Sequence, residues 1–65
     1  MYQDYPKRIK ALRRSQEISQ AKMAEELDIS ERTYRDIEHG ILSPRVDLLS
    51  KIAQQLGTTA SDLLR

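Results

Sequence analysis

The chain has 65 residues, enough for one small domain that buries only about 60% of the surface of its unfolded chain. It contains no cysteine, which excludes disulfides and thiolate metal sites, and no tryptophan or phenylalanine, so aliphatic side chains must form the core. The net charge is only +1, and no apolar run approaches the roughly 20 residues of a membrane span. The N-terminus does not resemble a signal peptide, so we expect a cytoplasmic protein.

The first predicted helix runs from about Pro6 to Gln16. Proline suits a helix start, and Ile9 and Leu12 are the apolar side chains that this helix should bury. The helix is rich in basic residues: Lys7, Arg8, Lys10, Arg13 and Arg14. A basic helix is most often a solvated surface, and the alternative is that some of these groups contact phosphates.

Segment 19–40 contains two short helical patterns with a very short link between them. Ser19 and Ser30 stand in front of the two patterns, where a serine side chain caps free backbone N–H groups, and Gly40 supplies a left-handed stop. The apolar residues of the first pattern recur at helical spacing: Met23, Ala24 and Leu27. So short a link makes the two helices cross steeply, as in a helix-turn-helix unit.

The second helix of this unit, predicted over 31–39, has one face with nothing apolar to bury. That face carries arginines and carboxylates: Glu31, Arg32, Arg35 and Asp36. The opposite face carries Thr33, Tyr34 and Ile37, with Glu38 at the border. A helix held by its back in this way is suited to reading a DNA groove. The alternative is a solvated helix with two surface ion pairs at i, i+4 spacing, Glu31–Arg35 and Arg32–Asp36.

The sequence pattern of the last third of the chain predicts two more helices after the loop 41–44. The first, over about 46–56, has a broad apolar face and ends at Gly57: Val46, Leu48, Leu49, Ile52, Ala53 and Leu56. The second opens with Thr59 as cap and Asp62 three residues later, a variant of the capping box. The prediction is therefore a compact all-α domain of five helices over residues 1–65.

Enzymatic chemistry finds little support in the sequence. The one histidine, His39, follows a helix end, where it most simply interacts with the helix dipole or a phosphate. It has no second ligand at metal-binding spacing, and the carboxylates are expected on exposed helix faces. We expect no catalysis, no metal, no cofactor and no small-molecule ligand.

A further pattern extends over most of the chain: Arg13, Ser19-Gln20, Ala24, Ile37-Glu38-His39-Gly40, Pro44 and Leu56-Gly57. With these residues at these spacings, the sequence from about Lys7 to Leu64 resembles the lambda repressor and Cro family of helix-turn-helix DNA-binding proteins. Glu17 and Asp28 depart from the pattern, because the family usually has glycine at both places. Aspartate tolerates the left-handed conformation better than most residues.

The resemblance implies a division between phosphate contacts and base contacts. In the family the side chain matching Gln20 touches a phosphate and braces the start of the recognition helix, and Lys22 and Arg45 are further phosphate candidates here. Base reading would fall to Glu31, Arg32, Thr33, Arg35 and Asp36. Arg32 is favoured as a reader of guanine, whereas a carboxylate can accept from cytosine or orient a neighbouring arginine.

Two further roles follow from the resemblance. In the family the first-helix arginine pairs with the glutamate that ends the recognition helix, so Arg13 and Glu38 should form a structural clamp. The loop after the recognition helix usually carries polar residues, but here it begins with Ile41 and Leu42. These two side chains either pack on the domain's own core or, together with Leu64, form a homodimer interface.

These features together predict a sequence-specific transcriptional regulator, associated with the nucleoid and dimeric at least on DNA. It would bind a dyad-symmetric duplex operator through the major groove and repress by occluding a promoter. Activation through an acidic patch, Glu25 and Glu26, is one alternative. Another is a protein-interaction module of the same fold, such as an antitoxin or anti-repressor.

Overall fold

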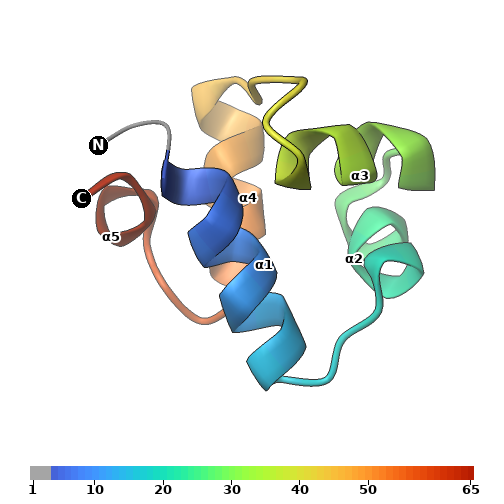
Figure 1. Ribbon diagram of the computed structural model, residues 1–65, viewed down its shortest axis with the longest axis horizontal. Helices are drawn as coiled ribbons and strands as arrows, with labels where there is room; N and C mark the ends of the chain where they lie inside the picture. The colour runs from blue at the N-terminus through green and yellow to red at the C-terminus, as the bar shows by residue number, and fades with distance from the viewer. Residues whose placement is uncertain (1–3) are drawn as a thin grey trace.

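The computed structural model describes residues 4–65, which form five α-helices and no strand: α1 (Tyr5–Ser15), α2 (Gln20–Leu27), α3 (Glu31–Glu38), α4 (Val46–Gln55) and α5 (Ala60–Leu64). Helix α2 packs on α3 and α4, α1 packs on α3 and α5, and α4 packs on α5. Figure 1 shows α2 and α3 on one side of the molecule and α5 on the other. The predicted all-α, five-helix fold is confirmed. Residues 1–3 of the domain predicted over 1–65 lie outside the described residues.

The core is aliphatic apart from one tyrosine, as the composition requires. Every helix contributes to it: Ile9, Met23, Ala24, Leu27, Tyr34, Ile37, Leu49, Ile52, Ala53, Leu56 and Leu63. Leu12, Leu48 and Leu64 pack against this core but are only partly buried. The expectation for Val46 was wrong, because this side chain is 79% exposed. Val46 is the first residue of α4, one turn before the buried Leu49, and its side chain extends past the part of α4 that packs on the core.

Side-chain caps fix where three of the helices begin. The backbone N–H of Lys22 donates to Ser19 Oγ at 3.0 Å, and that of Thr33 donates to Ser30 Oγ at 3.0 Å. At α5 the N–H of Asp62 donates to Thr59 Oγ1 at 3.1 Å. The carboxylate of Asp62 does not complete a capping box, since it accepts from the side chains of Thr58 and Arg65 instead.

The two residues at which the sequence departs from the family it resembles both adopt the left-handed conformation. Glu17 has a φ of 58° and Asp28 a φ of 59°. After α1, Ile18 N–H donates to Arg13 O and Glu17 N–H to Arg14 O, the hydrogen-bond pattern of a Schellman motif. These two turns set the directions in which α2 and α3 leave, so they place the second helix of the motif against the rest of the domain.

Candidate nucleic-acid interface

Helix α3 presents a polar face and buries an apolar one. Glu31, Arg32 and Arg35 are exposed, and Thr33 and Asp36 are half-buried. The back of the helix is buried against the domain through Tyr34, Ile37 and Glu38. Figure 1 shows α3 along one edge of the molecule. All five residues predicted to read bases therefore lie outside the buried core, on a helix held from behind.

The charges on this face are not equally available. Arg35 Nη2 lies 3.3 Å from Glu31 Oε2 in an exposed ion pair. The second ion pair expected on α3, between Arg32 and Asp36, does not form among the described residues. Arg32 makes no hydrogen bond or ion pair with any residue of 4–65, so its guanidinium can engage a ligand without losing a partner. Arg35 uses one nitrogen, Nη2, on Glu31 and keeps its other N–H groups for a ligand.

Thr33 stands at the start of α3 with one side of its hydroxyl occupied. Ser30 Oγ donates to Thr33 Oγ1 at 2.8 Å, in addition to accepting from the Thr33 backbone. The hydroxyl proton of Thr33 is then the group left to donate, and a base or phosphate acceptor suits it. The cap therefore orients Thr33 as well as starting the helix.

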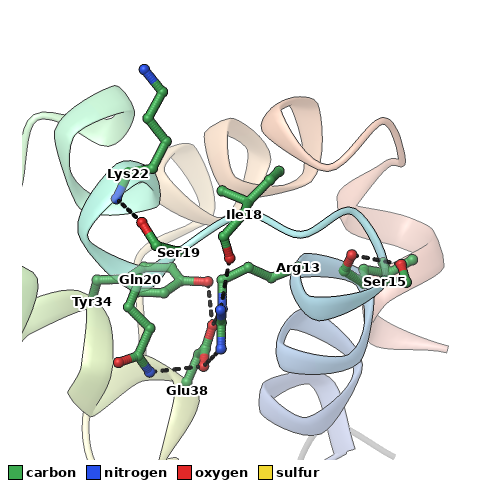
Figure 2. A network of polar contacts seen from close by, with 9 residues as sticks. Arg13, Ser15, Ile18, Ser19, Gln20, Lys22, Tyr34 and Glu38 are labelled. Carbon is green, nitrogen blue, oxygen red and sulfur yellow. Dashed lines mark hydrogen bonds and ion pairs between the residues drawn. The ribbon is translucent and has the colours of Figure 1, made fainter.

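Arg13 and Glu38 meet between α1 and the end of α3. Arg13 Nε donates to Glu38 Oε2 at 2.6 Å, and Arg13 Nη2 donates to Glu38 Oε1 at 3.2 Å. The third nitrogen, Arg13 Nη1, donates to the carbonyl of Ile18 at 2.8 Å. Figure 2 shows the guanidinium reaching from α1 to the carboxylate. The expectation that every carboxylate lies on an exposed face was wrong for Glu38, because the Arg13 side chain allows it to be buried.

Two further side chains donate to the same carboxylate. The hydroxyl of Tyr34 donates to Glu38 Oε2, and Gln20 Nε2 donates to Glu38 Oε1 at 3.1 Å (Figure 2). Burial raises the pKa of Glu38, but the hydrogen bonds from Arg13, Tyr34 and Gln20 outweigh it and hold this pKa below its ordinary value. Burial, together with the neighbouring carboxylate, raises the pKa of the Tyr34 hydroxyl. In the part of the chain that the structure describes, no buried polar side-chain atom lacks a partner.

The three residues predicted to bind phosphates differ in their contacts. Gln20, half-buried at the start of α2, reaches the end of α3 through Glu38 rather than bracing its start as expected. Lys22 Nζ lies 3.1 Å from Glu26 and 3.8 Å from Glu25, so much of its charge is already compensated. Arg45 is exposed in front of α4 and makes no side-chain contact with the other described residues.

The loop after α3 exposes its apolar side chains. Ile41 is 73% exposed and Leu42 is 42% exposed, so neither belongs to the buried core. Both backbone N–H groups donate to the carbonyl of Asp36, at 2.9 and 3.2 Å, which ties the loop to α3. Leu64 lies elsewhere, half-buried against the core from α5. The exposed large hydrophobic side chains of the described residues all come from segment 41–46, which we call the apolar segment.

Sequence reasoning missed some inward-facing polar groups. Arg8, one of the basic residues of α1, donates to the carbonyl of Leu63 at 3.0 Å and so ties α1 to α5. The sequence places Tyr34 only on the face opposite the charged one, although its position four residues before Glu38 indicates a contact along one helix face. No sequence signal identifies the Leu63 carbonyl as an acceptor.

Other kinds of site find no support in residues 4–65. No group of three or more His, Cys, Asp or Glu side chains there could hold a metal ion. None of the helices in this range is long and apolar enough to span a membrane.

The comparison with known families matches this arrangement of helices. A helix-turn-helix family model matches residues 9–63, which include α2, α3, α4 and most of α1 and α5. Comparisons with curated proteins and with solved structures give no significant match. The family match covers most of the chain, and the chain therefore belongs to the helix-turn-helix family of lambda repressor and Cro type, whose members are DNA-binding transcriptional regulators.

Proposed function

We propose that this helix-turn-helix protein is a repressor that binds a dyad-symmetric operator as a homodimer, with α3 of each subunit in the major groove. The observation that carries the proposal is the contrast between the two faces of α3. Its back is fixed by a buried, fully hydrogen-bonded cluster, and its front presents Arg32 without an intramolecular partner. A rigid helix with an uncommitted arginine suits bidentate donation to guanine O6 and N7.

The remaining α3 side chains support this reading role in different ways. Thr33 offers a hydroxyl proton, and Asp36 offers a carboxylate that can accept from cytosine N4 or orient an arginine. Glu31 holds Arg35 through Nη2 alone, so it can orient the arginine while the remaining N–H groups are available to DNA. The half-site should accordingly contain at least one G·C pair contacted by Arg32.

Phosphate contacts position the domain on the duplex. Gln20 at the start of α2 and Arg45 at the start of α4 each stand beside free backbone N–H groups, which favour an anion. Arg45 makes the larger electrostatic contribution, because it is charged and unpaired among the described residues. Lys22 contributes less, since binding a phosphate competes with Glu25 and Glu26.

The apolar segment supports the homodimer. A small domain that exposes Ile41 and Leu42 next to its reading helix gains by covering them with the same surface of a second copy. Leu64 would contribute only its exposed part. Such an interface is small, so we expect weak dimerisation in solution that the operator strengthens. Activation through the acidic patch of Glu25 and Glu26 has less support than repression, because Lys22 compensates part of the charge of this patch.

Selection from a pool of random DNA duplexes tests the proposal. We expect an enriched motif with dyad symmetry, whose half-site centres lie about 10 base pairs apart, because two recognition helices must meet successive major grooves. Inserting five base pairs between the half-sites should abolish cooperative binding. No enriched motif, together with capture of a protein partner through the apolar segment, would favour a protein-interaction module instead.

A further inference from the structure

Tyr34 connects the core of the domain to a side chain at the DNA-facing surface. Its ring is completely buried, and its hydroxyl donates to Glu38 Oε2. The other oxygen of the same carboxylate accepts from Gln20 Nε2 at 3.1 Å. Figure 2 shows the tyrosine and the glutamine approaching Glu38 from α3 and α2. One carboxylate thus joins a residue that DNA cannot touch to a predicted phosphate contact.

The hydrogen bonds around Glu38 fix where its two oxygens lie. Arg13 donates to both oxygens from α1, Tyr34 adds a donor to one, and Gln20 adds a donor to the other. If the tyrosine hydroxyl is removed, Oε2 keeps only its bond from Arg13, so the carboxylate is held by fewer donors and can shift toward the arginine. The acceptor that orients Gln20 is then less firmly placed.

Gln20 needs this orientation to serve a phosphate. Its primary amide has two N–H donors, and one of them is used on Glu38. Because that bond restricts the rotation of the amide, the second N–H has a preferred direction before DNA arrives. A side chain that is ordered in advance loses less entropy on binding.

We propose that Tyr34 is a positioning residue for DNA binding, and that its hydroxyl acts through Glu38 to hold the Gln20 amide ready for a backbone phosphate. The inference rests on the proposed DNA-binding function and adds to it a residue that makes no contact with DNA. Because a phosphate contact carries no sequence information, the effect of Tyr34 should be the same for every operator variant.

The relay from Tyr34 through Glu38 to Gln20 is tested by a double-mutant cycle on operator affinity. The two changes are Tyr34→Phe and Gln20→Ala. Phenylalanine keeps the buried ring and removes only the hydroxyl, so the variant retains the core packing. Tyr34→Phe should weaken binding about three- to tenfold, the loss expected for one hydrogen bond. In the Gln20→Ala background the same change should have less than about a twofold effect, because the residue through which it acts is gone.

A matched control separates the relay from a general effect of losing a tyrosine. Tyr5 is partly buried, and its hydroxyl makes no hydrogen bond with another residue of 4–65. Tyr5→Phe should leave affinity unchanged in both backgrounds. All affinities are measured well below the melting temperature of each variant, so that unfolding does not lower the apparent affinity.

The outcomes distinguish the relay from the function on which it rests. A wild-type protein that binds no duplex overturns both. If the wild-type protein binds a specific operator but Tyr34→Phe lowers the affinity equally in the wild-type and Gln20→Ala backgrounds, the relay alone is overturned. In the DNA-free protein, Tyr34→Phe should move the NMR signals of the Gln20 side-chain amide toward those of an exposed glutamine. Signals that do not move would also contradict the relay.

Discussion

The Arg13 guanidinium lies 2.6 Å from the Glu38 carboxylate, and the side chain of Glu38 has no exposed surface. Because a buried charge left without its partner is costly, Arg13→Ala should lower the free energy of unfolding by about 3–5 kcal/mol. That is a large part of the roughly 5–15 kcal/mol typical of a small domain. Urea unfolding measures the change, with Arg14→Ala on the exposed side of α1 as the control. A loss as small as that of the control would mean that the pair does not hold α1 to α3.

Acid should destabilise the domain through the same carboxylate. The pKa of Glu38 is lowered in the folded protein, where hydrogen bonds from Arg13, Tyr34 and Gln20 outweigh burial. Its contribution to stability is therefore present above the unfolded pKa of about 4.5 and is lost as the pH falls through the lower folded value. Denaturant unfolding measured from about pH 7 down to about pH 3, a range that spans carboxylate titration, should show this loss of stability. In Glu38→Gln the free energy of unfolding should fall less steeply as the pH is lowered. If the free energy of unfolding falls equally steeply with pH in Glu38→Gln, groups other than Glu38 cause the loss of stability in acid.

The left-handed conformation of Glu17 leaves room for stabilisation. A residue with a side chain at a φ of 58° is strained by about 1–2 kcal/mol relative to glycine. Glu17→Gly should therefore raise the melting temperature, although greater freedom in the unfolded chain offsets part of the gain. Glu17→Ala keeps the strain and serves as the control. Equal melting temperatures for the glycine and alanine variants would show that the turn is not strained.

Leu42→Lys tests what the apolar segment does. The side chain is 42% exposed and does not belong to the core, so stability should change by no more than about 0.5 kcal/mol. If the segment joins two subunits, the variant stays monomeric at high concentration and loses cooperative operator binding. Ser43→Lys adds the same charge next to it and keeps the leucine, so it should remain cooperative. Cooperative binding by Leu42→Lys would exclude this loop as the interface.

The fold was predictable where sequence neighbours determine it. Ser19 and Ser30 cap helices through N–H groups only three residues away, and such local contacts are visible in the sequence. The periodicity of α4 correctly assigned Leu49 to the core but could not show that Val46, at the start of the helix, is exposed. Helical spacing describes the faces of a helix, whereas exposure depends on which other helices reach each end.

The candidate site was predictable only in part, for a similar reason. Glu38 brings together donors from three different helices, and the spacing within any one helix does not specify that meeting point. The family resemblance supplied Arg13 as its partner. It did not supply the contact from Gln20 to the far end of α3, which depends on how α2 and α3 cross. It did not supply the hydroxyl of Tyr34 either, although that contact lies within α3 at i, i+4 spacing.

Base reading by α3 is tested most directly by Arg32→Ala, with affinity measured across all single-base variants of the selected operator. Arg32 has no partner within residues 4–65 that its removal would disturb. We expect a loss of about 1–3 kcal/mol confined to one base pair per half-site, where the preference for guanine disappears. Arg45→Ala, the phosphate control, should weaken all variants equally and reduce the salt dependence. A uniform loss for Arg32→Ala, with every base preference intact, would contradict base reading by this residue.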